Sequence, residues 1–343
     1  MDTVANLPAA DRAELFRETG ERMELSGALV EKDFWVCWTL GQLFEMESVR
    51  DMLMFKGGTS LSKVFKLVDR FSEDIDLAID YAPLGFVGER DPVTEMSRTR
   101  REKLLDEMMT ACQEYIADVF LEAFRARCAA AIRDPESWTL AVSDDDPNAV
   151  EFVYPSANLR PVEFVKPRIL LEMGTHAELI PSDEYSIKSF AAEQFPSGFA
   201  RPSCRVRAIK AERTFWEKAT ILHAERHRPL EKPMPEGHAR HYYDMFMLAR
   251  AAVCDSAVSD LELLHRVVEH KSKFYYTGWA RYDLAVPGTL ALVPSAARHT
   301  ELRRDYGAMA RMIFGEPPPL EEILDELARL EARINESPRR PGE

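Results

Sequence analysis

The spacing of hydrophobic and polar positions changes along the chain, and this change predicts a mixed α/β front portion. From Leu7 to Glu45 apolar residues recur at helical spacing, with breaks expected at Gly20 and at Ser26, the expected N-cap of the second helix. The apolar run MLMF at 52–55 ends in Lys-Gly-Gly, which predicts a short buried strand that enters a turn.

The stretch after this turn combines a predicted helix with predicted strands. Apolar residues at helical spacing predict a helix in 59–68, and the alternation of acidic and apolar residues in DIDLAI (74–79) predicts a strand with two faces. A long helical tract follows over about 92–132. Two strand-like runs around an Asp-Asp-Pro-Asn turn predict a hairpin at 138–155, and VKPRILLEMG (165–174) predicts a further strand.

The back portion of the chain is predicted to be almost entirely helical. Apolar periodicity indicates helices at 210–227, 239–252, 260–271, 301–314 and 320–335. We therefore expect two domains: residues 1–209, a mixed α/β core with N-terminal helices and a helical insertion, and residues 210–343, a helical domain.

Composition narrows the class of protein. The chain has 343 residues, 46% hydrophobic and 30% charged, which is ordinary for a globular protein. No apolar run approaches the roughly 20 residues of a membrane span, and the five scattered cysteines favour reduced thiols. A cytoplasmic protein without a membrane partner is expected. The net charge of -14 argues against indiscriminate nucleic-acid binding, which needs local Lys and Arg.

The segment FKGGTSLSKVFKLVDRFSEDIDLAI (55–79) has the residues of a site for a polyphosphate and a metal. Gly57 and Gly58 permit close approach of the backbone to a ligand before a helix, and Thr59 and Ser60 add hydroxyl donors. Together these four residues are predicted to bind the phosphates of a nucleoside triphosphate. A glycine pair alone is more often a plain turn.

Two acids on the following strand supply the predicted metal ligands. Side chains at i and i+2 of a strand share a face, so Asp74 and Asp76 point together while Ile75 and Leu77 point into the core. Two converging carboxylates repel each other unless a cation such as Mg²⁺ lies between them. D-x-D alone is more often a solvated strand face, but its conjunction with the glycine turn favours phosphoryl transfer assisted by two metal ions.

Other metal and nucleotide motifs receive no support. His223 and His227 have the i, i+4 spacing of two zinc ligands, but Glu225 stands one residue too late for the H-E-x-x-H motif. No P-loop, nucleophile-elbow or Rossmann glycine pattern occurs in the chain.

These residues together resemble a known family. The segment 55–79 is similar to the first motif of the AbiEii-type nucleotidyltransferase toxins, which include the mycobacterial MenT group and belong to the DNA polymerase beta nucleotidyltransferase superfamily. Gly58, Ser60, Asp74 and Asp76 occupy the positions of the superfamily pattern. Further similar segments span nearly the whole chain: EKDFWV, ERTFWEKATILHAE, RHYYDMFML, HKSKFY and LRRDYGAMARMIF. The resemblance implies an α+β fold, a polymerase-beta-like mixed sheet with a helical insertion, followed by an α-helical C-terminal domain.

The resemblance also implies roles for single residues. It makes Asp74 and Asp76 the metal-binding pair, Ser72 a neighbour of the triphosphate, and Lys218 the catalytic lysine that contacts the phosphates. Asp244 matches the final acidic motif, and Glu172 is the candidate third carboxylate of the metal site. Each has a simpler reading: Lys218 and Asp244 as surface positions of helices, and Glu172 on the solvent face of a strand.

The implied activity is a Mg²⁺-dependent transfer of a nucleoside monophosphate from an NTP to an acceptor, with Mn²⁺ as an alternative cation. By resemblance the acceptor is the 3′ end of a tRNA, and the protein is a growth-inhibiting toxin paired with an antitoxin. Basic residues that are candidates for tRNA contact occur at 98–103, at 201–210 and around 225–232. Nucleotidylation of a small molecule or of a protein hydroxyl, and a non-catalytic nucleotide-binding module, remain alternatives.

Overall fold

In the computed structural model, which describes residues 1–72, 74–162 and 165–336, the chain divides into two compact units. The first unit comprises Met1–Val64 and Phe71–Ile209, and the second comprises Phe65–Arg70 and the residues from Lys210 onward. A short segment from the front of the chain therefore packs with the back portion. The division into the two predicted domains stays a prediction.

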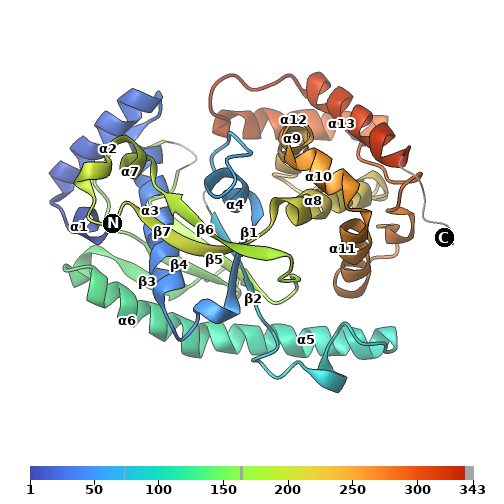
Figure 1. Ribbon diagram of the computed structural model, residues 1–343, viewed down its shortest axis with the longest axis horizontal. Helices are drawn as coiled ribbons and strands as arrows, with labels where there is room; N and C mark the ends of the chain where they lie inside the picture. The colour runs from blue at the N-terminus through green and yellow to red at the C-terminus, as the bar shows by residue number, and fades with distance from the viewer. Residues whose placement is uncertain (73, 163–164, 337–343) are drawn as a thin grey trace. The chain divides into compact units, whose positions relative to one another are not determined.

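A seven-stranded mixed sheet forms the centre of the first unit (Figure 1). Its order is β3-β4-β5-β2-β1-β7-β6, with β2–β5 and β1–β7 parallel and the remaining pairs antiparallel. The strands are β1 (Leu53–Lys56), β2 (Asp74–Ile79), β3 (Thr139–Val142), β4 (Ala149–Val153), β5 (Arg168–Gly174), β6 (Ser182–Lys188) and β7 (Ser203–Ile209). This mixed sheet with many helices confirms the predicted α+β class.

The first unit also contains helices. They are α1 (Asp2–Ala5), α2 (Ala9–Met23), α3 (Gly27–Glu45), α4 (Gly57–Lys63), α5 (Arg98–Tyr115), α6 (Leu121–Ala131) and α7 (Phe190–Gln194). A π-helical turn at Ile116–Phe120 joins α5 to α6 into one long helix, which Figure 1 shows running beneath the strands. Trp35 and Trp38 of α3 are fully buried in the same core as Ile75 of β2. The opposite side of β2 carries Asp74 and Asp76 at its start and the buried Ala78, which packs with Met54 and Ile209.

Of the two helix breaks predicted near the start of the chain, the one at Ser26 is confirmed and the one at Gly20 is wrong. Ser26 is the N-cap of α3, as predicted, and its hydroxyl accepts a hydrogen bond from the Leu29 amide. The expected break at Gly20 is wrong, since α2 continues to Met23. Gly20 instead permits close approach of the returning chain: a Cβ there would lie 2.5 Å from the Leu25 carbonyl oxygen.

Two further expectations need correction. The helix predicted at 59–68 begins at Gly57 and ends at Lys63, and Lys66 adopts a positive φ of 53° that no helix continues through. Strands β6 and β7 were not expected. β6 is an edge strand with the mostly polar sequence SDEYSIK, which lacks the apolar alternation of a half-buried strand.

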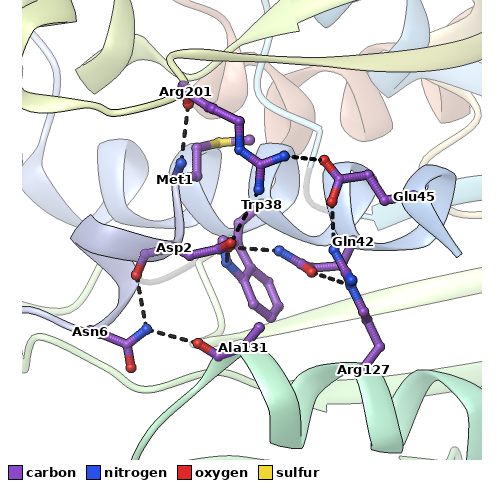
Figure 2. Close-up of polar contacts among 9 residues, drawn as sticks. All are labelled: Met1, Asp2, Asn6, Trp38, Gln42, Glu45, Arg127, Ala131 and Arg201. Atoms are coloured by element: carbon purple, nitrogen blue, oxygen red, sulfur yellow. Dashed lines mark hydrogen bonds and ion pairs between the residues drawn. The ribbon is translucent and has the colours of Figure 1, made fainter.

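A polar network ties the start of the chain to the first unit (Figure 2). The Asp2 carboxylate accepts hydrogen bonds from the buried Trp38 indole at 2.9 Å and from the Gln42 amide at 2.8 Å. Arg127 of α6 donates to Gln42 at 2.6 Å, and Arg201 contacts Glu45 at 2.9 Å. These contacts connect α1, α3 and α6.

The second unit is helical, as predicted. Its helices are α8 (Ala211–Arg226), α9 (Ala239–Ala249), α10 (Val253–Ser259), α11 (Leu261–Phe274), α12 (His299–Met309) and α13 (Leu320–Asn335). The five cysteines of the chain are free, and four are buried. Among the described residues, no helix is both long enough and apolar enough to cross a membrane.

Glu31 of α3 makes the stability of the first unit depend on pH. Its buried carboxylate accepts a hydrogen bond from the Ala157 amide, and burial raises its pKa to about 7, against the opposing effects of that bond and of Arg12. The folded state therefore holds a proton that the unfolded chain releases near pH 4.3. Stability should fall by about 2 kcal/mol as pH rises from 4.5 to 7.5.

Urea unfolding across this pH range tests the prediction. Glu31→Gln is expected to flatten the pH dependence, whereas Glu18→Gln, at an exposed position of α2, should leave it intact. A slope that persists in Glu31→Gln would show that other groups cause it.

Candidate functional site

The acidic positions of β2 lie in register with charged residues on both neighbouring strands. Asp76 pairs with Lys56 of the antiparallel β1 and with Glu172 of the parallel β5. Cross-strand partners project from the same side of a sheet, so these three side chains and Asp74 share one face. Ile75, whose side chain projects to the opposite face, is fully buried. The register thus places the three carboxylates predicted from the sequence on one face of the sheet, but among the described residues they do not form a group that could hold a metal, so Glu172 is not supported as a third ligand.

The glycine turn lies directly against this row of charges. Gly57 has a φ of 78°, which an L side chain rarely adopts. A Cβ at Gly57 would overlap the Asp76 carboxylate, lying 2.6 Å from its Cγ and 2.9 Å from its Cβ. The backbone at Gly57 and the Asp76 side chain are therefore in contact, and only glycine permits that contact.

The hydroxyls of Thr59 and Ser60 stabilise the turn through hydrogen bonds to backbone carbonyls. Both residues are buried, at 1% and 0% exposure. Thr59 donates to the backbone carbonyl of Asp74, and Ser60 donates to the carbonyl of Gly57 at 2.9 Å. In this conformation both hydroxyls connect the turn to itself and to β2, and neither lies at the surface as a phosphate donor would.

The remaining predicted neighbour, Ser72, is itself half-buried. Glu73, the first acid of the EDID sequence, lies outside the described residues. Gly58 is half-buried beside Gly57 at the start of α4.

The residues present fit a divalent cation held by two carboxylates. Asp74 and Asp76 are half-buried on the same face, and the missing Cβ of Gly57 leaves room for the Asp76 carboxylate beside the turn. Within the described part of the chain, no group of three or more His, Cys, Asp or Glu side chains is arranged to hold a metal. Mg²⁺ commonly uses one or two carboxylates plus phosphate oxygens and water, so such a group is not required.

Lys218 and Asp244 meet in the interior of the second unit. The Lys218 ammonium lies 2.7 Å from the Asp244 carboxylate, and Arg70 donates to both oxygens of that carboxylate at 2.6 and 2.8 Å. Asp244 is 0% exposed, and Lys218 is 6% exposed. The simpler reading of these two residues as surface positions of helices is wrong.

The electrostatics of this cluster follow from its burial. Burial by itself raises the pKa of Asp244, but Arg70 and Lys218 outweigh it and hold that pKa below its ordinary value. Burial lowers the pKa of Lys218, and Arg70 adds to this effect while Asp244 opposes it.

Several charged residues near the site were not predicted. Lys63 of α4 pairs with the buried Asp33 of α3, whose other oxygen accepts from the Phe190 amide at 2.6 Å. Lys32 donates to the backbone carbonyl of Arg168 at the start of β5. The segment EKDFWV resembled the toxin family, but adjacent residues on a helix point apart, so its spacing carried no signal of these roles.

His223, the α8 member of the histidine pair, is structural. His223 accepts a hydrogen bond from the Ala291 amide on Nδ1, at 3.1 Å, and its Nε2 lies 2.9 Å from the Arg281 carbonyl. Both ring nitrogens are therefore engaged, and burial lowers the pKa of His223 to about 4. This arrangement leaves no ring nitrogen for zinc.

Comparison with known proteins gives one family match. The family model described as "Nucleotidyl transferase AbiEii toxin, Type IV TA system" matches residues 39–326. No curated protein matches the chain. Among solved structures, the chain is similar to MenT4, a nucleotidyltransferase toxin from Mycobacterium tuberculosis H37Rv, over 95% of this chain and 89% of that chain, with a TM-score of 0.47 and 16% identity.

Replacement of Gly57 tests the contact between the turn and Asp76. Gly57→Ala should destabilise the protein by about 2 to 4 kcal/mol, because it adds steric overlap to the strain of a positive φ. Gly85→Ala is the matched control: Gly85 has a φ of 91° but no atom within 4 Å of its would-be Cβ. It should cost only the strain, about 1 kcal/mol.

Urea unfolding of both variants measures the difference. Equal losses of stability in the two variants would contradict a close contact between Gly57 and Asp76.

Proposed function

We propose a function from one premise: the chain belongs to the AbiEii family of nucleotidyltransferase toxins of type IV toxin–antitoxin systems. In this proposal the protein transfers a nucleoside monophosphate from an NTP to the 3′ end of a tRNA. The observation that carries this proposal is the register of β2. That register aligns Asp74, Asp76 and Glu172 on one face, beside a turn that only glycine can form. The family membership supports the transfer chemistry, and the resemblance of the motifs supports the acceptor.

Asp74 and Asp76 are the proposed ligands of Mg²⁺, or of Mn²⁺ in its place. The bound cation would stabilise negative charge on the triphosphate. Glu172 is exposed and lies opposite Asp76 in the strand register. We therefore assign Glu172 the role of general base, whose carboxylate oxygen accepts the proton of the attacking acceptor hydroxyl. The acceptor oxygen then bonds to the α-phosphorus, the bond from that phosphorus to the bridging oxygen breaks, and pyrophosphate leaves.

The glycine turn and Lys218 are the proposed phosphate contacts. Because Thr59 and Ser60 direct their hydroxyls inward, we assign the contact in the turn to the backbone of Gly57 and Gly58. Ser72 is the proposed further neighbour of the triphosphate. The resemblance of the motifs supports Lys218 as the cation that binds phosphate.

The proposed biological role is that of a toxin that acts in the cytoplasm, where a blocked tRNA 3′ end halts translation. A cognate antitoxin is the implied partner. Arg201–Lys210, the basic stretch considered for tRNA contact, largely coincides with β7, on which Arg205 is exposed. Arg98 and Lys103 of α5 each contact a glutamate one turn further on, so that helix is less suited to phosphate.

Asp76→Asn tests the proposed activity with little change in shape. We expect transfer of label from α-labelled NTP to tRNA to fall about 100-fold or more, because the amide cannot replace a charged metal ligand. Asp145→Asn, in the exposed β3–β4 turn, is the control and should retain activity. Labelling of a small molecule or of protein, with tRNA unlabelled, would identify a different acceptor. Transfer by Asp76→Asn at the wild-type rate would exclude this site.

Metal removal provides a separate test. Chelation of divalent cations with EDTA should abolish transfer, and addition of Mg²⁺ or Mn²⁺ in excess should restore it. Zinc in place of these cations should restore little, because carboxylate and phosphate oxygens suit the harder cations. Full activity in EDTA would contradict a role for a divalent cation.

A further inference from the structure

One turn near the start of α3 carries three consecutive charged residues, Glu31, Lys32 and Asp33, and each is exposed by 5% or less. Adjacent residues of a helix point in different directions, so they meet different parts of the first unit. Lys32 donates to the carbonyl of Arg168 at the start of β5, whereas Asp33 contacts α4, the helix that begins with the glycine turn. A buried charge is costly unless it is paired, so each of these contacts matters to the fold.

The contact between α3 and α4 is a buried ion pair. The Asp33 carboxylate pairs with the ammonium of Lys63, the last residue of α4, and the two side chains are only 5% and 9% exposed. Desolvation offsets most of the attraction in such a pair. Its main effect is therefore to define where the two side chains lie.

Phe190, the first residue of α7, completes this contact. Its amide donates to the other Asp33 oxygen at 2.6 Å, and its ring centroid lies 4.0 Å from the Lys63 ammonium. Each of the three residues thus contacts the other two. They belong to α3, α4 and α7, which all lie in the first unit.

The position of α4 depends on contacts of this kind. The helix has seven residues and begins with two glycines. Isolated helices shorter than about 12 residues are marginal in water, and glycine lowers helix stability further. Tertiary contacts must therefore hold α4 in place. Lys63 supplies one at its last residue, directly before Val64, where this stretch of the first unit ends.

The opposite end of α4 contacts both aspartates of β2. The Thr59 hydroxyl donates to the backbone carbonyl of Asp74. Gly57 leaves space for the Asp76 carboxylate, whose Cγ would lie 2.6 Å from a Cβ at that position. A helix of two turns moves as one piece, so a shift at Lys63 would also disturb these contacts.

We propose that Asp33 and Lys63 are positioning residues, whose ion pair fixes α4 and thereby the contacts of the glycine turn with Asp74 and Asp76. This inference rests on the proposed function for its effect on catalysis. Both oxygens of Asp33 are engaged, so the pair acts through α4 and not as a metal ligand. A displacement of about 1 Å in a site can cost about 100-fold in rate.

Amide hydrogen exchange on the full chain tests the positioning of α4 without any need for activity. In Lys63→Met, exchange of the α4 amides should become at least about tenfold faster, because the helix loses the contact at its end. Lys63→Arg should show a smaller increase, since it keeps the charge but changes the geometry.

Lys32→Met is the matched control for this experiment. Lys32 is a buried cation next to Asp33 in sequence, but it contacts β5 instead of α4, so its replacement should leave α4 exchange unchanged. Wild-type exchange of α4 in Lys63→Met, or an equal increase in Lys32→Met, would overturn the proposal.

A double variant separates positioning from stability. Asp33→Asn combined with Lys63→Met leaves no unpaired charge in the interior, so it should unfold at a urea concentration closer to that of the wild type than either single variant does. Its kcat for nucleotide transfer should nevertheless stay at least about tenfold below wild type, because the neutral pair does not fix α4. A kcat that recovers together with stability would show that the pair is merely structural.

The proposed function and the positioning role fail in different ways. A wild-type chain that transfers no nucleotide would contradict the proposed function, and the exchange of α4 would still decide whether the ion pair fixes that helix. Wild-type kcat in the double variant, with transfer intact, would contradict the positioning role alone.

Discussion

The pairing of β2 with β1 on one side and β5 on the other is the constraint on which the proposed site depends. A shift of one residue in either pairing would turn Asp74 and Asp76 toward the core and would expose Ile75 in their place. The apolar residues of β2 resist such a shift, because Ile75 and Leu77 are fully buried. The hydrophobic core therefore determines which way the acidic residues point.

Buried charges reinforce this arrangement at several points around the strand. Asp33 and Lys63 connect α3 to α4, and Lys32 connects α3 to the start of β5. Such pairs contribute little net stability, because desolvation offsets most of their attraction, but they define geometry. In a site that must hold repelling carboxylates in a fixed position, the orientation that such pairs impose matters more than their contribution to stability.

Much of the site could be predicted because its signals are local. The alternation in 74–79 indicated which face of β2 carries Asp74 and Asp76, and Ser26 identified the start of α3. The register that places Glu172 opposite Asp76 could not be predicted from local sequence patterns, because β2 and β5 are distant in sequence. The candidate Glu172 came from the family resemblance, and its place beside Asp76 is a tertiary result.

The features that could not be predicted depend on contacts between distant segments. Arg70 and Asp244 are 174 residues apart, and no periodicity relates them. Lys56 was expected only as the end of a strand, yet the hairpin-like pairing of β1 with β2 brings it beside Asp76. Thr59 and Ser60 were expected to donate to phosphate, whereas the local fold engages both hydroxyls with backbone carbonyls. In each case tertiary contacts that no local pattern shows decided how the residue is used.

The central claim is that Asp74 and Asp76 together hold a divalent cation beside the glycine turn. Electron paramagnetic resonance titration of Mn²⁺, with a non-hydrolysable NTP analogue present, measures this binding directly. The account predicts that Asp74→Asn and Asp76→Asn each weaken Mn²⁺ binding by at least about tenfold, and that Asp244→Asn does not. Wild-type Mn²⁺ affinity in both β2 variants would contradict it.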